Sequence, residues 1–218
     1  MNILVEYIDH MGDDITVVNS ARVSFDKTSQ ITEEGLRKGD VKLINFLAKN
    51  NHFTPFTHPQ ITLRETVPIF VARQRFKHTV GFTYNEISRR YVDNPPEFYI
   101  PKEWRSRPDL SIKQGSGAVL EDGEDIEEQY REYIEHSKSL YNYLLKRDVA
   151  PEQARMVLPQ SMMTSYYVTG SLAAYARLVN QRSDSHAQKE IQELAGDINK
   201  IMIKLYPVSW AALTQGEY

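Results

Sequence analysis

Polar and apolar residues alternate along residues 60–67, a pattern that predicts a β-strand with one buried face and one polar face. One set contains Ile61, Leu63, Glu65 and Val67, and the alternating set contains Gln60, Thr62, Arg64 and Thr66. Pro68 then suits the first turn of a helix, and Gly81 suits a chain reversal after that helix. Residues 3–8 are predicted to form a further short strand.

The longest amphipathic pattern lies between residues 126 and 144. Its positions step by four and three residues, at Ile126, Tyr130, Tyr133, Ser137, Leu140 and Leu144. This spacing predicts a helix of nearly three heptads with one apolar face. We interpret that face as part of the core or of a subunit interface, rather than as a ligand-binding stripe.

Shorter patterns predict further helices. One would hold Ile15, Val18 and Val23. Another, with Asp40 as its cap, would end near residues 50–51 and carry Leu43, Ile44 and Leu47. A third is expected to open at Gly170 and Ser171 and to run to about Gln181. A last helix is expected to begin with a capping box of Ser185 and Gln188 and to bury Ile191, Leu194, Ala195, Ile198, Ile201, Met202 and Leu205.

Residues 102–125 are the best candidate for a long surface loop, because Pro108, Gly115, Gly117 and Gly123 stand there among polar residues. The chain shows no internal repeat and no convincing domain boundary. We therefore expect residues 1–218 to form a single α+β domain, with a mixed or antiparallel sheet packed against long helices.

Composition limits the chemistry more than the fold. The 218-residue chain is 41% hydrophobic and 25% charged, as in ordinary globular proteins, and its net charge is −3. This charge argues against a generally basic nucleic-acid binder but permits a local basic pocket. Cysteine is absent, which excludes disulfides, zinc–thiolate sites, iron–sulfur clusters and a cysteine nucleophile.

The first ten residues carry Glu6 and Asp9 and lack the basic segment that precedes the apolar stretch of a signal peptide. The longest apolar run, around residues 67–72, is far shorter than the ~20 residues that span a bilayer. We therefore expect a soluble, cytoplasmic protein that does not associate with membranes.

The strongest local charge is in residues 73–91, RQRFKHTVGFTYNEISRRY. A single acid, Glu86, is present beside the five cations Arg73, Arg75, Lys77, Arg89 and Arg90. On a helix that starts at Pro68, residues 73, 74, 77 and 78 would share one side. Such a face can bind phosphate through charge-assisted, bidentate hydrogen bonds. The alternative is an ordinary solvated basic face.

Two further clusters hold candidate chemistry. Residues 181–186 combine Arg182 and His186 at a predicted helix junction, which favours either an anion or nucleotide site or a plain capped turn. His52 and His58 flank a turn, but no third ligand has a suitable spacing, so we expect no metal site. Glycine-rich phosphate loops and hydrolase elbows are absent from the sequence. From the residues alone, the chain is interpreted as a binder of a phosphorylated or anionic ligand.

Residues 85–91 read Asn-Glu-Ile-Ser-Arg-Arg-Tyr and follow Lys77-His78-Thr79. This stretch resembles the signature of the flavin-dependent thymidylate synthases, in which an Arg-His-Arg triplet is followed after seven residues by Ser, in a run ending Asn-Glu-x-Ser-x-Arg-Tyr. The second half matches in full. The first half departs from the signature, because Lys and Thr replace both arginines and eight residues separate Thr79 from Ser88.

Five other segments resemble the family in the expected order, over about residues 15–210. They are residues 21–25 (Ala-Arg-Val-Ser-Phe), 52–58 with Thr57 in place of Glu, 152–159, 168–172 and 182–191. Near the C-terminus, Ser171 and Ala173 stand where the family usually has Asn and Arg.

The resemblance implies an enzyme that makes dTMP from dUMP, with 5,10-methylenetetrahydrofolate as carbon donor and NADPH as reductant through FAD. The absence of cysteine agrees with this, since the unrelated thymidylate synthases use a cysteine thiolate. A flavin supplies the difficult chemistry instead. The resemblance further implies a homotetramer with active sites between subunits, and no nucleic-acid partner.

The resemblance also implies roles for individual residues. It places around dUMP the residues Gln74, Glu86, Ile87, Ser88, Arg89, Arg90, Arg155 and Arg182. It places around FAD the residues Ser24, His52, Thr54, Lys77, His78, Thr79, Glu86, Ser171, Ala173, Arg177 and His186. Arg90 and Arg155 suit the phosphate, Ser88 is expected to donate a hydrogen bond, and Arg182 is expected to be catalytic. Lys77 lacks the arginine fork, so we expect a loosely held flavin.

Two alternatives remain open. One is a non-enzymatic nucleotide or RNA binder that stacks bases on Phe76, Phe82, Tyr84 and Tyr91 within the basic segment. The other is a flavoprotein of this fold that acts on another substrate or is inactive, which the departures at Thr57, Thr79 and Ala173 permit.

Overall fold

One antiparallel sheet organises the chain, in the computed structural model that describes residues 2–92, 94–108 and 115–214. Its spatial order is β1 (Leu4–Met11), β2 (Gln60–Pro68), β4 (Met163–Ser171) and β3 (Phe82–Glu86). The central strands β2 and β4 pair in unbroken register, with Gln60 opposite Ser171 and Pro68 opposite Met163. The strand expected at 60–67 is confirmed. The strand expected at 3–8 extends to Met11, and the sheet is antiparallel, not mixed.

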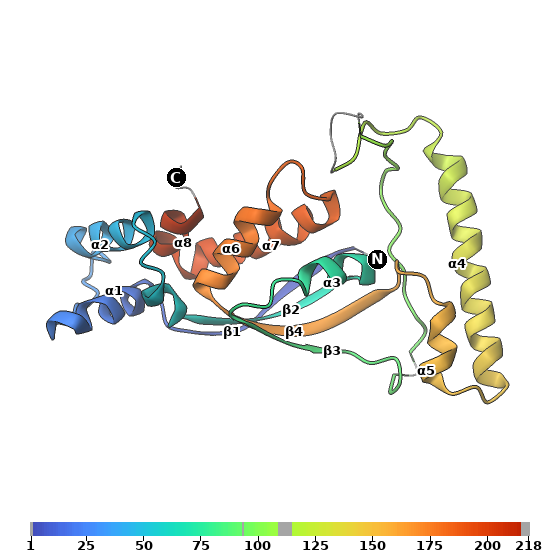
Figure 1. The fold of residues 1–218 in the computed structure, drawn as a ribbon, viewed down its shortest axis with the longest axis horizontal. Coiled ribbons are helices and arrows are strands. Elements are labelled where there is room, and N and C mark those ends of the chain that lie inside the picture. Colours follow the sequence, from blue (N-terminus) through green and yellow to red (C-terminus); the bar gives the residue numbers. More distant parts are fainter. Residues whose placement is uncertain (1, 93, 109–114, 215–218) are drawn as a thin grey trace.

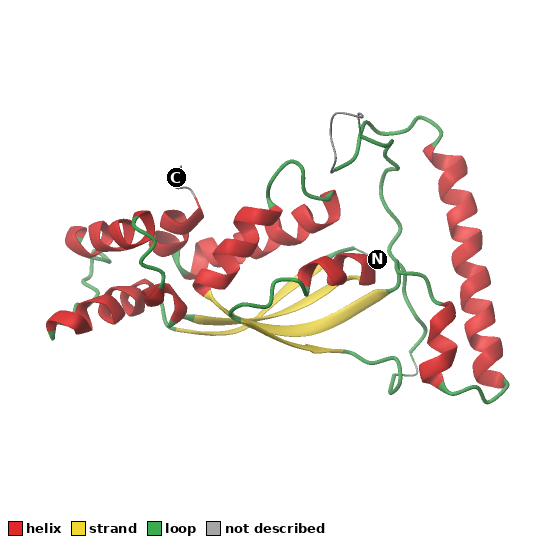
Figure 2. Cartoon of the chain, in the orientation of Figure 1, coloured by secondary structure: helices red, strands yellow, loops and turns green. Residues whose placement is uncertain are grey.

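Helices cover one face of the sheet and gather at its two ends (Figures 1 and 2). Over the face lie α3 (Ile69–Arg75), α6 (Leu172–Arg182) and α7 (Lys189–Leu205). At one end are α1 (Asp14–Arg22), α2 (Lys38–Lys49) and α8 (Pro207–Thr214), and at the other are α4 (Gly123–Lys146) and α5 (Pro151–Ala154). Single 3₁₀ turns occupy Val23–Phe25, Thr54–Thr57 and Arg155–Val157. The α+β prediction is therefore confirmed.

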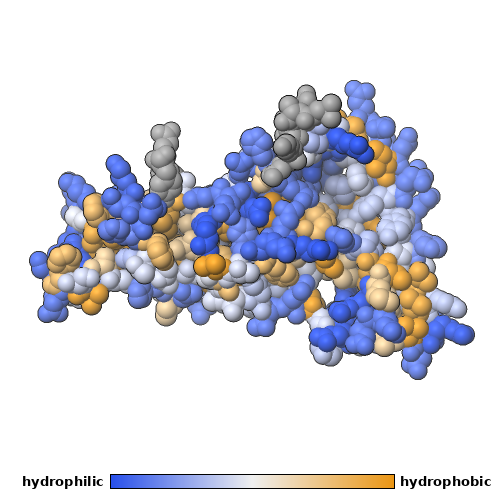
Figure 3. Space-filling model, in the orientation of Figure 1, coloured by the Kyte–Doolittle hydropathy of each residue, from blue (hydrophilic) through white to orange (hydrophobic). Residues whose placement is uncertain are grey.

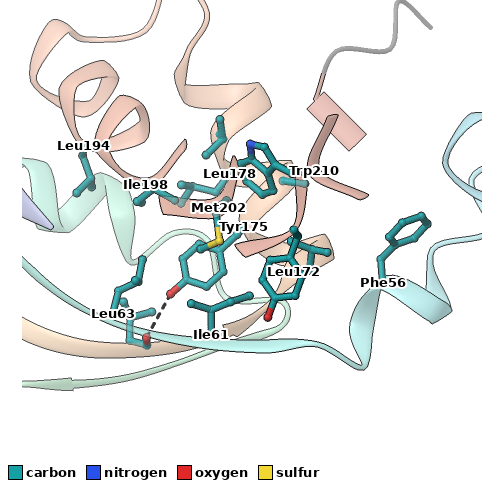
Figure 4. Packing of buried hydrophobic residues seen from close by; sticks show 14 of the residues in the cluster. Phe56, Ile61, Leu63, Leu172, Tyr175, Leu178, Leu194, Ile198, Met202 and Trp210 are labelled. Carbon is teal, nitrogen blue, oxygen red and sulfur yellow. Dashed lines mark hydrogen bonds between the residues drawn. The ribbon is translucent and has the colours of Figure 1, made fainter. Parts of the chain in front are cut away.

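The core lies between the covered face of the sheet and helices α6, α7 and α8. Figure 4 shows Ile61 and Leu63 of β2 facing Tyr175 of α6, with Ile198 and Met202 of α7 behind it. All five side chains are buried, so each contributes roughly 1.5–3 kcal/mol of hydrophobic stabilisation. The apolar periodicity of α7 identified its buried face correctly, since Ile191, Leu194, Ala195, Ile198 and Met202 are all buried.

Helix α4 stands apart from the sheet as an arm, and it confirms the long helix predicted from residues 126–144 (Figure 1). Ile134, Ser137 and Tyr141 are buried along it, and the Ser137 hydroxyl donates to the carbonyl of Val157 at 2.7 Å. Tyr133 and Leu140 of the predicted apolar face stay exposed, whereas Ile134 and Tyr141, which were not assigned to that face, are buried. Apolar side chains gather over the lower ends of α4 and α5 in Figure 3. The interpretation as core or interface therefore holds for the inner side, while the outer side has no partner within the described residues.

Several expected helix boundaries are wrong. Val23 lies beyond α1 in its own 3₁₀ turn and is 70% exposed. Asp40 is not a cap, because α2 begins two residues earlier and the Asp40 carboxylate is buried against the guanidinium of Arg22. Ser185 forms no capping box, because α7 begins after Gln188, which has no side-chain cap. Polar residues near a helix start can serve tertiary contacts instead of capping.

The loop expected at 102–125 is largely confirmed in its described part. Arg105 and Val119 form an isolated antiparallel bridge, and α4 already begins at Gly123. Residues 109–114 of this prediction lie outside the described residues. Among the described helices, none combines the length and the apolar character that crossing a bilayer requires.

Candidate active site

The basic segment begins on α3 but leaves the helix early. Helix α3 ends at Arg75 with Phe76 as its C-cap, so the expected helical face shared by residues 73, 74, 77 and 78 is wrong. Lys77 and His78 lie in the following turn, which reverses at Gly81 with a φ of +79°. A Cβ on Gly81 would lie 2.9 Å from that of Ala174 on α6. The backbone angle and this close approach both require glycine.

Arg75 is buried rather than part of a solvated basic face. Its side chain is 0% exposed and forms a fork with the equally buried Glu65, with Nε–Oε2 at 2.9 Å and Nη2–Oε1 at 3.0 Å. Nη1 donates to the Tyr84 hydroxyl at 2.6 Å, and the Tyr166 hydroxyl donates to Glu65 at 2.6 Å. Burial lowers the pKa of Arg75, but the Glu65 carboxylate outweighs this and raises it, so the guanidinium stays charged.

His78 joins this buried group to Arg182. The Tyr84 hydroxyl donates to the backbone carbonyl of His78 at 2.6 Å, and Nε of Arg182 donates to Nε2 of His78 at 2.9 Å. An accepting Nε2 carries no proton, so the imidazole is neutral with its proton on Nδ1. Burial, together with the positive charges of Arg182, Arg75 and Arg177, lowers the pKa of His78 to about 4.

Uncompensated positive charge surrounds this turn. Within the described part of the chain, Lys77, Arg177 and Arg182 form no ion pair. Arg177 donates to the carbonyl of Val80 at 2.5 Å, and Lys77 and Thr79 are exposed beside it. Cations without carboxylate partners favour a bound anion with several oxygens, such as a pyrophosphate.

Of three other residues predicted for the cofactor, Ser171 contacts this turn, whereas Ala173 and His186 have other surroundings. The Ser171 hydroxyl caps α6 by accepting from the backbone N–H of Ala174 at 3.2 Å, and the Ser171 backbone donates to Gly81. Ala173 packs against the core. His186 lies on the exposed loop before α7, paired with Asp184 at 2.9 Å. Sequence position alone did not show that the Ser171 hydroxyl is used as a helix cap.

Ser24, His52 and Thr54 lie at the end of the sheet where α1 and α2 gather (Figure 1). All three are exposed. Thr54 begins a 3₁₀ turn that packs against α6, and the His52 ring stands edge-on to Phe46 with ring centroids 5.9 Å apart. These residues are therefore near the start of α6, whereas Glu86 lies at the far end of β3.

Most of the residues predicted for the nucleotide meet in a second place, a pocket of about 640 Å³ between α3, the end of β3 and the turn after α5. Its polar lining includes Arg73, Glu86, Arg89, Glu152 and Arg155, and its apolar lining includes Ile87, Phe76 and Met156. The Glu86 carboxylate accepts from the Thr164 hydroxyl at 2.6 Å. The arginines bind backbone oxygens at most: Arg89 that of Asn94, and Arg155 that of Glu152 at 3.4 Å.

Ser88 and Arg90 extend the chain just beyond this pocket. The Ser88 hydroxyl accepts from Nε of Arg90 at 3.1 Å, and the Arg90 guanidinium lies 5.0 Å from the ring centroid of Tyr91. Both Arg90 and Tyr91 are exposed. Among the described residues, the side-chain partner of the Ser88 hydroxyl is Arg90 rather than a base, consistent with a hydrogen-bonding role rather than a nucleophilic one.

One chain does not unite the predicted nucleotide residues. Glu86, Ile87, Arg89 and Arg155 line the pocket. Gln74 and Arg182 do not line it, since Gln74 donates to Gln188 and Arg182 donates to His78. The candidate residues therefore form two groups. The pocket group consists of Glu86, Ile87, Arg89 and Arg155. The turn group consists of Lys77, His78, Thr79, Arg177 and Arg182.

Two features of the site were missed from the sequence. Glu65 stands in the apolar phase of the strand at 60–67, and this was the available signal that a charge is buried there. Gln188, which binds Gln74, carried no such signal. Among the described residues, no group of three His, Asp or Glu side chains is placed to hold a metal ion.

The packing of the aromatic residues removes the basis for the RNA-binding alternative. Phe76, Phe82 and Tyr84 pack against the core, and only Tyr91 of the four is fully exposed, at 77%. Single-strand binding needs ring faces that bases can reach. A stacking platform therefore does not exist along this segment.

Comparison with known proteins identifies the family. The sequence model described as "Thymidylate synthase complementing protein" matches residues 6–208. The chain therefore belongs to the family of flavin-dependent thymidylate synthases, which makes it an enzyme.

Particular relatives cover nearly the whole chain. The flavin-dependent thymidylate synthase of Thermosipho africanus is 37% identical over 97% of this chain and 90% of its own length. That of Thermus thermophilus is 34% identical over 97% of this chain and 75% of its own. The crystal structure of the UMP/dUMP methylase PolB from Streptomyces cacaoi with 5-Br dUMP has a TM-score of 0.86 at 30% identity, covering 98% of this chain and 95% of PolB.

Proposed function

We propose that this chain methylates dUMP to dTMP, with 5,10-methylenetetrahydrofolate as the carbon donor, NADPH as the reductant and FAD as the cofactor. The methylene carbon replaces the hydrogen on C5 of the pyrimidine, a hydride that originates from NADPH reduces it to a methyl group, and tetrahydrofolate is released. When bound, FAD passes the reducing equivalents from NADPH to the transferred carbon. No cysteine nucleophile takes part.

The observation that carries the proposal is the pocket with three arginines that lack ion-pair partners in the described chain. Arg73, Arg89 and Arg155 line it, and the pocket volume suits a nucleotide. A phosphate dianion would receive bidentate hydrogen bonds from Arg155, with Arg90 and the Ser88 hydroxyl beside it. The apolar wall of Ile87 and Met156 would cover the sugar and base.

The turn group fits the pyrophosphate of FAD. Lys77 and Arg177 supply positive charge, and the Thr79 hydroxyl is exposed beside them. Lys77 is a point charge on a flexible stem rather than a rigid fork. The residues therefore fit the cofactor, and its affinity is expected to be lower than with arginine at positions 77 and 79.

Arg182 is the residue proposed to be catalytic. Its guanidinium, placed against N3 and O4 of uracil, would stabilise the anion that forms as C5 becomes nucleophilic. Hydrogen bonding to a neutral imidazole leaves its charge uncompensated for this purpose.

The separation of the two groups supports active sites that lie between subunits of a homotetramer. A pocket group of one subunit beside a turn group of another would complete each site. The exposed Leu140 on the α4 arm, together with Tyr133 at 54% exposure, offers apolar surface for such an assembly.

PolB is described as acting on both UMP and dUMP, so UMP is the second candidate substrate. The test is product analysis by chromatography after incubation with FAD, NADPH and 5,10-methylenetetrahydrofolate, with dUMP or UMP in parallel. Formation of dTMP that requires all three additions supports the proposal. If only UMP yields a methylated product, the substrate is the ribonucleotide. The absence of any methylated product would contradict the proposed function.

A further inference from the structure

A polar cluster, three of whose four members are fully buried, lies beneath the turn group. It consists of Glu65, Arg75, Tyr84 and Tyr166 and is called here the Glu65–Arg75 cluster. We infer that the Glu65–Arg75 cluster is a positioning device, which fixes the backbone of His78 through Tyr84 so that His78 holds the Arg182 guanidinium in place for the substrate ring. The identity of that ring rests on the proposed function.

The role of the cluster is better explained by the positions in which it holds its side chains than by a contribution to the free energy of unfolding. Glu65 and Arg75 are both 0% exposed, and desolvation offsets much of the attraction within a buried ion pair. The two side chains are nevertheless held in fixed positions, because the Arg75 guanidinium binds Glu65 in a bidentate way and Tyr166 donates a further hydrogen bond to Glu65. The Arg75 guanidinium also lies 4.4 Å from the Phe82 ring centroid, which limits its movement.

Tyr84 transmits this rigidity to the turn. Its hydroxyl accepts from Nη1 of Arg75 at 2.6 Å and donates to the carbonyl of His78 at 2.6 Å. Burial raises the pKa of Tyr84 to about 12, so the hydroxyl keeps the proton that it donates. The backbone carbonyl of His78 is therefore bound by Tyr84, which is itself bound to Arg75 of the buried ion pair.

His78 in turn constrains Arg182 at one nitrogen. Nε of Arg182 is bound to His78, while its two terminal nitrogens make no hydrogen bond with any described residue. This leaves a planar pair of donors for two acceptor atoms of a substrate. The charged groups that act on His78 are Arg177 and Arg182 on α6 and Arg75 on α3, so all three would repel a protonated imidazole, which could no longer accept a hydrogen bond from Arg182.

The test compares Tyr84→Phe with the matched control Tyr130→Phe. Tyr130 also donates to a backbone carbonyl, that of Tyr99 at 3.1 Å, but it lies on the α4 arm. We expect Tyr84→Phe, assayed at saturating FAD and compared at equal flavin content, to lower kcat roughly 10- to 100-fold, as a small displacement of a substrate-positioning group does, with the KM for NADPH unchanged. Tyr130→Phe is expected to keep wild-type kcat. Equal kcat in the two variants would overturn the inference.

A second measurement is independent of activity and of the proposed substrate. Nitrogen-15 NMR of labelled histidine reports whether Nε2 of His78 is an unprotonated acceptor, with His78→Gln used to assign the signal. The inference predicts an unprotonated Nε2 in the wild type and a shifted signal in Tyr84→Phe, but not in Tyr130→Phe. A protonated Nε2, or an unchanged signal in Tyr84→Phe, would overturn it. A wild type that shows this signal but makes no dTMP would contradict the proposed function alone.

Discussion

Arg182 and His78 form a pair in which a cation binds a neutral imidazole instead of a carboxylate. A carboxylate at this position would cancel the charge of the guanidinium, whereas the imidazole orients it and leaves the charge available. The low pKa of His78 is a consequence of the same arrangement, because burial and three arginines oppose its protonation.

Replacement of Arg182 is expected to remove turnover without removing the cofactor. For Arg182→Ala we expect kcat to fall about 100- to 1,000-fold, the usual loss when one group that stabilises a developing anion is deleted. The control is Arg147→Ala, an exposed arginine after α4. A near-normal rate in Arg182→Ala, measured at equal flavin content, would refute its catalytic role.

The His78 pKa predicts a dependence of stability on pH. Because the unfolded chain binds a proton near pH 6.5 and the folded chain only near pH 4, the free energy of unfolding should fall as the pH is lowered through this window. The loss between pH 7 and pH 5 should be on the order of 1–2 kcal/mol larger in the wild type than in His78→Gln. Urea unfolding at one protein concentration measures it. Identical losses in both proteins would contradict the buried, neutral state of His78.

The sequence singled out residues that lie within a family motif as candidates for the site. It did not single out residues whose only partners are distant in the sequence. Arg182 and His78 were identified through the family signature. Glu65 and Arg75 were not identified, because each is stabilised by the other and by tyrosines from β3 and β4, which no local pattern connects. The apolar phase of Glu65 in its strand was the one local sign.

At the level of elements, sequence patterns found β1, β2 and the longer helices but not their ends, and they did not predict β3, β4, α5 or α8. Helix α3 ends at Arg75 because the chain then reverses at Gly81, which brings the Tyr84 hydroxyl to the His78 carbonyl. Helical spacing in the sequence shows neither the reversal nor this contact. The start of α7 is set by the preceding turn, in which the Asp184 carboxylate accepts from the backbone of His186 at 2.7 Å. This turn displaces the expected capping box of Ser185.

Helix α4 is expected to support the nucleotide pocket through one hydrogen bond. The buried Ser137 hydroxyl holds the Val157 carbonyl in the 3₁₀ turn that also carries Arg155. Ser137→Ala should cost about 1 kcal/mol of stability and weaken dUMP binding several-fold, since the turn loses its anchor. Calorimetric titration with dUMP measures the affinity. Ser139→Ala, on the exposed side of α4, should match the wild type, and a Ser137→Ala affinity equal to that of Ser139→Ala would contradict this coupling.

At the scale of the whole molecule, the candidate site residues of one chain form two separate groups, which in the proposed homotetramer would be two half-sites. Arg155 lines the pocket and Arg182 does not, so the sequence named candidate members of the site but could not show that one chain keeps them apart. The proposed assembly would also cover the exposed apolar residues of α4, such as Leu140.

Mixing two inactive variants tests whether sites are shared between subunits. Arg155→Ala and Arg182→Ala should each be inactive alone, while co-expression of the two should restore part of the activity, because some sites combine an intact pocket group with an intact turn group. The mixed protein should elute at about four times the 25.2 kDa subunit mass. Activity that stays absent in the mixed tetramer would mean that both groups act within one chain.

The central claim, that this chain is a flavin enzyme acting on a uracil nucleotide, is tested most directly by its visible absorption spectrum. The purified protein is measured as isolated and after addition of FAD, then with NADPH and separately with dUMP. We predict flavin bands that bleach with NADPH and shift with dUMP. A colourless protein whose spectrum shows no bound flavin after FAD is added would contradict the account.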